Sequence, residues 1–168
     1  MFLVRFIFFG VAFLMGTPAF AMGNVPSTSM TNSSLIGRAA PDFTLDTTGQ
    51  SNVNFTKFRE GKRAVIFFWA TWCPHCHEEI ENLNLHLDKM EQQGIKIALV
   101  DLGESKDEVK SYLAGRNFKL DSFMDTDSIL SGPYDLIGVP TLYFVDEQGI
   151  IRDLQHAFPA NYEELFKK

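Results

Sequence analysis

The sequence predicts an α/β domain with a mixed central sheet, helices on both faces and an N-terminal β-hairpin extension. Two apolar runs, residues 64–69 and 95–102, alternate with segments of helical spacing, which is typical of parallel β-α-β units. Two later strand-like segments are separated by a short turn with a glycine, which favours an antiparallel pair. A parallel first half joined to an antiparallel second half gives a mixed sheet.

The hairpin is predicted at residues 43–46 and 51–55, whose alternating apolar side chains flank a loop that contains Gly49. Residues 64–69 are almost continuously apolar, as expected of a central strand that is buried on both faces. This strand leads directly into the part of the sequence that carries the cysteines.

A helix is predicted to begin at Pro74 and to end at Gly94. Its inward face consists of apolar residues at helical spacing: Ile80, Leu83, Leu87 and Met90. Residues 95–102 then form a second buried strand, and residues 104–117 a second helix. Residues 128–137 predict a helix broken by Gly132-Pro133, and residues 159–168 a closing helix. The remaining strands are predicted at residues 121–125, 141–145 and 150–154.

The first 21 residues are predicted to be a signal peptide. Arg5 is their only charge, residues 6–15 form an apolar run, and Ala19 and Ala21 fit a signal-peptidase site. The run is short for a membrane span, although an uncleaved leader would serve as an inner-membrane anchor. We therefore expect export to a cell envelope, most simply a bacterial periplasm.

Residues 22–34 are small, polar and without periodicity, so they predict a flexible linker before a single domain at residues 35–168. Removing the leader takes one of the 15 Lys and Arg residues and none of the 21 Asp and Glu residues, which makes the net charge −7. An acidic domain without a basic run is a poor partner for nucleic acid.

Cys73 and Cys76 are the only two cysteines in the chain. A disulfide between them would close a very small loop and add little stability, so the spacing suits a bond that opens and closes. Pro74 can begin a helix, which places Cys73 at a helix N-terminus where the dipole favours a thiolate. In the oxidising compartment that export implies, a single close pair indicates redox chemistry rather than scaffolding.

Three motifs resemble the thioredoxin-like superfamily, and in particular its TlpA/ResA subgroup of exported thiol–disulfide oxidoreductases, which is related to the redoxin and AhpC/TSA domains. Residues 69–76, Trp-Ala-Thr-Trp-Cys-Pro-His-Cys, resemble the active-site segment. Residues 37–45 with Gly61-Lys62 resemble the opening of the subgroup, and residues 138–141 resemble the cis-proline loop. The resemblance covers residues 35–168 and implies a thioredoxin-like fold.

The resemblance also implies roles for individual residues. Cys73 would be the exposed attacking thiol and Cys76 the buried resolving thiol. Pro140 would follow a cis peptide bond, and Val139 would offer its backbone to an extended substrate. Apart from the resemblance, we expect Trp69 and Trp72 to flank the site and to shield Cys76 from water.

Two further positions bear on the tuning of the cysteines. Cytosolic thioredoxins carry a buried aspartate where this chain has Phe67, so that proton carrier is missing. Glu79 matches a glutamate of the subgroup and would relay protons to or from the thiols. Pro74-His75 is a dipeptide also seen in strongly oxidising proteins, and an imidazolium at His75 would lower the pKa of Cys73, below about 7.

The implied function is a thiol–disulfide oxidoreductase that exchanges the Cys73–Cys76 disulfide with cysteines of other exported proteins. The subgroup favours a reductase of the cytochrome c maturation type, whereas His75 favours an oxidant of the DsbA functional type. No large helical insertion separates Cys76 from Pro140, so the DsbA architecture itself is not expected. No cofactor or metal is required, and the expected partners are cysteine-containing envelope proteins and a membrane or periplasmic redox protein.

Other chemistries fit the cysteines less well. Residues 73–77 match the Cys-x-x-Cys-His spacing of covalent haem attachment, but a strand entering the motif does not suit a helical wrap around haem. A copper or zinc site would use both cysteines and His77, with His86 and His156 as further ligands only by default. A peroxidase nucleophile needs Thr-x-x-Cys, which the spacing from Thr71 to Cys73 misses by one residue.

Overall fold

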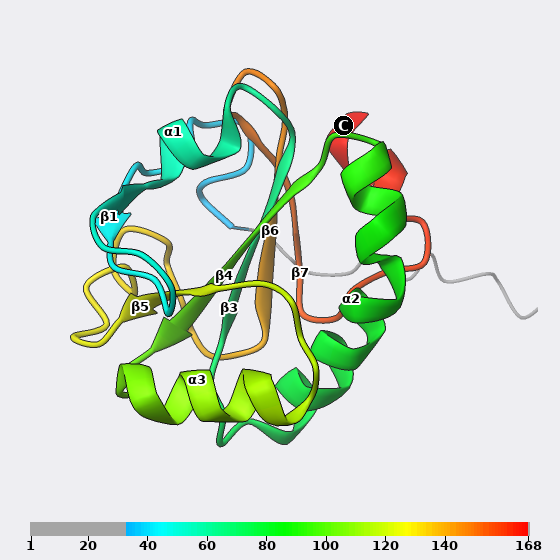
Figure 1. Cartoon of the computed structure of the whole chain (residues 1–168). Helices are drawn as coiled ribbons and strands as arrows, with labels where there is room; N and C mark the ends of the chain where they lie inside the picture. The colour runs from blue at the N-terminus through cyan, green and yellow to red at the C-terminus, as the bar shows by residue number, and fades with distance from the viewer. Residues whose placement is uncertain (1–32, 168) are drawn as a thin grey trace, which may run out of the picture. The chain divides into compact units, whose positions relative to one another are not determined.

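The computed structural model describes residues 33–167, so the predicted signal peptide and all but the end of the predicted linker lie outside the described residues. The architecture is a five-stranded sheet in the order β5-β4-β3-β6-β7, with a separate two-stranded sheet β1-β2 (Figure 1). Over residues 33–167, no helix combines the length and the apolar composition that a membrane crossing requires.

The strands are β1 (Thr44–Leu45), β2 (Val53–Asn54), β3 (Ala64–Trp69), β4 (Lys96–Leu102), β5 (Ser122–Asp125), β6 (Thr141–Val145) and β7 (Ile151–Gln155). The helices are α1 (Phe55–Arg59), α2 (Pro74–Gln92), α3 (Lys106–Gly115) and the 3₁₀-helix η1 (Tyr162–Lys167).

The sheet is mixed, as the sequence predicts. β3 pairs in parallel with β4, and β4 in parallel with β5, whereas β6 is antiparallel to both β3 and β7. β3 is the central strand and all six of its residues are buried, which accounts for its continuous apolar sequence. In the parallel register Trp69 lies beside Asp101, so both residues stand at the carboxyl ends of their strands.

α2 and α3 cover the same face of the sheet together with η1. The chain steps from β3 to β4 to β5 in one direction, and right-handed crossovers then place both helices on one side. Their core is shared by both cysteines and by apolar side chains of these elements, among them Trp69, Ile80, Val109 and Tyr162. The site therefore lies on the helical face, at the end of β3.

The opposite face is covered by the β1-β2 hairpin, α1 and a run of turns. Phe43 and Phe55 stack with ring centroids 5.0 Å apart, and Tyr134 contacts both Phe43 and Phe68. Helical residues thus lie on both faces, as predicted, although on this face they amount to the single short α1 within the described residues.

The predicted broken helix at residues 128–137 is wrong, because the segment is a series of turns. Ser128 and Asp135 have positive φ, and the Asp125 carboxylate accepts the backbone N–H groups of Ile129 at 2.8 Å and Leu130 at 2.9 Å. A side chain from the end of β5 thus satisfies donors that a helix would have used internally.

Two other elements differ from the expectation. The second strand of the hairpin is only Val53–Asn54, because Asn54 caps α1 by accepting the N–H of Lys57 through its side chain at 3.0 Å. The closing helix is the 3₁₀-helix η1, whose Tyr162, Leu165 and Phe166 are buried against the sheet as the helical spacing predicts.

Candidate active site

The cysteine pair lies where β3 ends and α2 begins. Cys73 is the N-cap of α2, and Pro74 is the first helical residue, where its missing N–H costs nothing. The Sγ of Cys73 accepts the N–H of Cys76 at 3.1 Å. The two cysteines form a disulfide with a Cα–Cα distance of 5.3 Å. The helix N-terminus thus directs a backbone donor at the sulfur of Cys73, a contact that stabilises a thiolate in the reduced form.

Cys73 is less exposed than expected for an attacking thiol. Only 4% of its surface is accessible, and Cys76 is completely buried. The cover comes from the loop before β6, since the Cys73 Sγ lies 3.7 Å from the carbonyl oxygen of Val139. Both cysteines are thus buried in the disulfide form, and the different accessibility expected of their thiols stays a prediction.

The loop beside the disulfide contains a cis peptide bond between Val139 and Pro140. The Thr141 hydroxyl donates to the Gly138 carbonyl at 2.7 Å, and the ring of His156 donates through Nδ1 to the Pro140 carbonyl at 2.9 Å. A depression of about 400 Å³ follows this loop, lined by His75, Ile137, Gly138, Val139, Pro140 and His156. It is open to solvent next to the disulfide and offers room for a polypeptide segment.

Trp72 and His75 project into solvent around the pair. Trp72 is 68% exposed, and the His75 side chain is 82% exposed. The His75 Nδ1 lies 3.7 Å from a carboxylate oxygen of Glu78, one turn along α2. Its charged neighbour in the disulfide form is therefore Glu78, and an action of His75 on Cys73 stays a prediction.

Glu79 is half-buried on α2 and reaches the segment that follows β7. Its carboxylate accepts the backbone N–H of Phe158 at 2.6 Å. The side chain thus joins α2 to the end of the sheet, in addition to any role in proton transfer.

Glu104 is a residue of the site that the sequence reading missed. Its carboxylate accepts both the backbone N–H of Thr71, at 2.5 Å, and the Thr71 hydroxyl. His77, considered above as a haem ligand, donates from Nε2 to the Thr71 carbonyl at 2.6 Å. Its ring packs on Tyr112, with the two ring centroids 5.0 Å apart. The sequence could have indicated Glu104, because Glu104 follows β4 and Cys73 follows β3, and parallel strands end at the same edge of the sheet.

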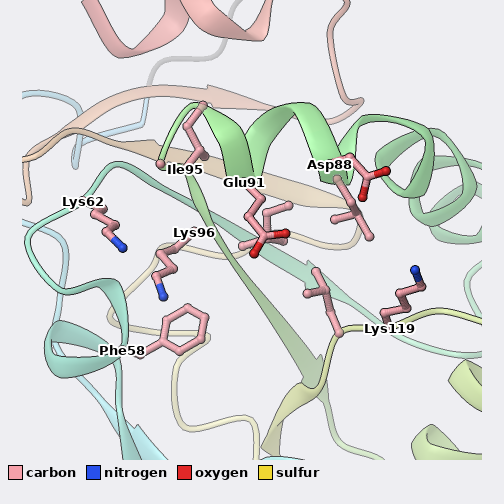
Figure 2. A pocket seen from close by; sticks show the side chains of 11 residues that line it. Phe58, Lys62, Asp88, Glu91, Ile95, Lys96 and Lys119 are labelled. Atoms are coloured by element: carbon pink, nitrogen blue, oxygen red, sulfur yellow. The ribbon is translucent and has the colours of Figure 1, made fainter.

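A second pocket lies at the other end of the sheet, far along α2 from the cysteines. Its volume is about 330 Å³, and apolar side chains such as Phe58 and Ile95 line it together with charged groups. Figure 2 shows Asp88 and Glu91 coming from α2, opposite Lys96. It has no cysteine and belongs to a different surface from the disulfide. Across residues 33–167, no cluster of three or more His, Cys, Asp or Glu side chains is arranged to hold a metal ion.

Solved structures with the same chain path confirm the thioredoxin-like fold. A thiol:disulfide interchange protein DsbE from Chlorobium tepidum, described as putative, superimposes with a TM-score of 0.69 at 24% identity, covering 79% of this chain and 93% of that one. The thioredoxin domain of a thiol-disulfide oxidoreductase from Bacteroides vulgatus gives 0.71 at 21% identity, covering 80% and 98%. With a cysteine pair at the N-terminus of α2, this fold defines the class of thioredoxin-like thiol–disulfide oxidoreductases.

Within this class, residues 36–154 match the AhpC/TSA family, and the chain belongs to that family. The thiol:disulfide interchange protein DsbE of Yersinia pestis is 34% identical over 163 residues, which are 95% of this chain and 82% of that protein. The thiol-disulfide oxidoreductase ResA of Bacillus subtilis is 28% identical over 113 residues, 67% of this chain and 63% of that protein. The chain is a thiol–disulfide oxidoreductase of the DsbE/ResA type.

Proposed function

We propose that this protein is an envelope reductase that transfers electrons from the Cys73 and Cys76 thiols to disulfides of other exported proteins. The observation that carries the proposal is the pair itself: the chain's only cysteines are joined at a helix N-cap, beside the open Val139–Pro140 loop. The similarity to proteins named DsbE and ResA supports the same chemistry.

The reaction is two successive exchanges that conserve atoms and electrons. Cys73 loses its proton and attacks one sulfur of a substrate disulfide, and the other substrate sulfur leaves as a thiolate that takes up a proton. Cys76 then loses its proton and attacks the Cys73 Sγ, releasing the second substrate sulfur and forming the Cys73–Cys76 disulfide. Two electrons have passed to the substrate, and a redox partner in the envelope must return them.

The substrate is a polypeptide that enters along the depression next to the disulfide. The backbone of Val139, whose carbonyl already faces the Cys73 Sγ, is the natural partner for an extended segment. Ile137, which is fully exposed and lines this depression, and the exposed Trp72 beside Cys73 in the chain offer apolar surface to such a segment. Reduced cysteine pairs of apocytochromes before haem attachment are the product class that this proposal favours.

Envelope location rests on the sequence of the first 21 residues. Expression of the full chain in a Gram-negative host, followed by osmotic-shock fractionation and mass measurement, tests it. A periplasmic product that begins after Ala21 is expected. Retention of the leader in a membrane fraction would instead indicate an anchor, and a cytoplasmic product would rule out export.

The competing function is thiol oxidation, which His75 favours. Equilibration of the Cys73–Cys76 disulfide with glutathione decides between the two directions. A reduction potential near that of thioredoxin, about −270 mV, supports a reductase, and one near that of DsbA, about −120 mV, supports an oxidant. His75→Ala is the matched variant, and it is expected to lower the potential only if the imidazolium stabilises the Cys73 thiolate.

A trapping experiment identifies the substrates. Cys76→Ala leaves Cys73 able to attack but removes the thiol that resolves the mixed disulfide, so partners accumulate as covalent adducts that a reductant releases. Cys73→Ala is the matched control and should trap nothing. Equal trapping by both variants, or by neither, would contradict the assigned roles.

A further inference from the structure

Two carboxyl groups lie beside the turn that carries Cys73, outside the cysteine pair itself. Glu104 uses both carboxylate oxygens on Thr71, one for its backbone N–H and one for its hydroxyl. Thr71 stands two residues before Cys73, in the turn that joins β3 to α2. Glu104 therefore sets the position of this turn from the neighbouring strand connection.

Asp101, at the end of β4, is the second carboxyl group. It is completely buried, and its Oδ1 accepts the backbone N–H of Glu104 at 3.3 Å. Its Oδ2 is buried without a hydrogen-bond partner within residues 33–167. A charged oxygen in that position would be uncompensated, which favours the neutral carboxylic acid over the carboxylate. Burial, followed by the side-chain contact and the charge of Glu104, raises the pKa of Asp101 to about 8, whereas the backbone N–H of Glu104 opposes the shift.

We propose that Asp101 and Glu104 are a positioning pair for the redox turn: while Asp101 holds a proton, Glu104 binds Thr71, and loss of that proton releases Thr71. This inference rests on the proposed thiol–disulfide exchange, since it concerns the same site. The proton passes to water, and no bond other than the O–H of Asp101 is broken.

The release follows from the repulsion between two carboxylates in a poorly solvated place. The backbone of Glu104 is held, because its N–H binds Asp101 and its carbonyl accepts the Thr126 hydroxyl at 3.5 Å. Its side chain is only half-buried and can turn towards water. When Asp101 ionises, the Glu104 carboxylate can therefore reduce the repulsion by moving away from Thr71 towards water.

Other titratable and charged groups come from the elements packed around the pair. They are Glu108 and Tyr112 on α3, Arg116 at the C-cap of α3, His77 and Glu81 on α2, and Asp125 on β5.

Ionisation of His77, Glu108 or Tyr112 would not release Thr71 from Glu104 near pH 8. His77 donates to the Thr71 carbonyl through Nε2, and this nitrogen keeps its proton in both the charged and the neutral ring. The hydrogen bonds from Ser105 lower the pKa of Glu108, so Glu108 is ionised throughout the range. Burial raises the pKa of Tyr112 above its ordinary value of 10, so Tyr112 ionises only at higher pH than Asp101.

A pH titration of the oxidised full chain by two-dimensional ¹H–¹⁵N NMR tests the pair without measuring activity. The Thr71 amide signal is expected to change with a midpoint near pH 8, because its acceptor leaves. Asp101→Asn imitates the neutral acid and should abolish that change, whereas the exposed Asp107→Asn should retain it. The proposal would be overturned if the Thr71 signal of the wild type showed no change with a midpoint near pH 8. It would also be overturned if Asp101→Asn still showed that change.

Glu104→Gln supplies a second variant should Asp101→Asn not fold. Without the charge of Glu104, the Thr71 transition near pH 8 should disappear, and loss of the paired hydrogen bonds should slow exchange with a disulfide substrate about tenfold at pH 7. An unchanged transition or an unchanged exchange rate in this variant would contradict a positioning role.

The exchange rate itself separates this inference from the proposed function. The wild type and Asp101→Asn have the same cysteines, so thiol ionisation changes the exchange rates of both proteins alike. It therefore cancels in the ratio of the wild-type exchange rate to the Asp101→Asn exchange rate. The ratio should fall about fivefold or more between pH 6.5 and pH 9, given the energy of one charge-assisted hydrogen bond. A constant ratio overturns the positioning pair alone, whereas a wild-type protein without exchange at any pH overturns the proposed function.

Discussion

At the scale of single residues, the chemistry of Cys73 depends on two backbone groups. The N–H of Cys76 donates to its sulfur at 3.1 Å, and the carbonyl oxygen of Val139 lies 3.7 Å from the same sulfur. The first contact stabilises a thiolate and the second opposes it, so a substrate that occupies the Val139 backbone also changes the electrostatic environment of the sulfur. Binding and ionisation are therefore coupled at this one atom.

Glu79 has two candidate roles, and a pair of substitutions separates them. Glu79→Ala removes the acceptor for the Phe158 N–H, so the free energy of unfolding should fall by about 1–3 kcal/mol in urea titrations. Glu79→Gln keeps an oxygen acceptor and should lose less than about 1 kcal/mol, but a proton carrier would be gone and exchange should slow at least about tenfold. The exposed Glu78→Ala is the control. If Glu79→Gln exchanges at the wild-type rate, Glu79 is an anchor alone.

The raised pKa of Asp101 also predicts how the free energy of unfolding depends on pH. Its pKa rises from 3.8 in the unfolded chain to about 8 in the fold, so between these values the native state holds a proton that the unfolded state has released. The free energy of unfolding should therefore decrease with pH across this window, by at most about 1.4 kcal/mol per pH unit, and level off above pH 8. Asp101→Asn should have a flatter profile in urea titrations from pH 4 to 9, and identical slopes would contradict the assignment.

At the scale of elements, the connections after β4 and β5 each begin with a contact to an acidic side chain at the end of the strand. Asp101 and Asp125 stand at equivalent places, each at the carboxyl end of a buried strand, and each accepts a backbone N–H from the segment that follows. Asp125 accepts two such groups and converts residues 128–137 into turns. These turns then place Leu130 and Tyr134 over the second face of the sheet.

Removing the Asp125 carboxylate should loosen this segment. Asp125→Ala leaves the N–H groups of Ile129 and Leu130 without their acceptor, so the free energy of unfolding should fall by about 1–3 kcal/mol. Hydrogen exchange at those two amides should accelerate as well. The exposed Asp127→Ala is the matched control and should behave as wild type. Unchanged protection of both amides in Asp125→Ala would show that the turns hold themselves.

The elements that could be predicted are those whose signal is local. Residues 64–69 coincide with β3, because burial on both faces demands a continuous apolar run. Pro74 marked the start of α2 through its own geometry. The turns at 128–137 depend instead on a side chain outside the segment, and Glu104 meets Thr71 across 33 positions of sequence. Such contacts exist only once the sheet has formed, so spacing along the chain does not reveal them.

At the scale of the whole domain, the sheet separates redox chemistry from the rest of the surface. The disulfide, Glu104 and the Val139–Pro140 loop gather where β3 and β4 end and β6 begins, while the pocket around Phe58 and Lys96 lies at the opposite end of these strands (Figures 1 and 2). The cysteines belong to the core cluster on the α2 face of the sheet, so the stability of that cluster should depend on the redox state of the pair.

The direction of electron flow can therefore be tested by comparing the stability of the oxidised and reduced proteins against unfolding. A low reduction potential means that the fold favours the disulfide form, and a high one that it favours the reduced form, as in DsbA. For the proposed reductase we expect the oxidised protein to unfold at a higher urea concentration than the dithiothreitol-reduced protein. Each 30 mV of potential corresponds to about 1.4 kcal/mol between the two forms. A double variant, Cys73→Ser with Cys76→Ser, should show no effect of reductant, and a more stable reduced form would make the protein an oxidant.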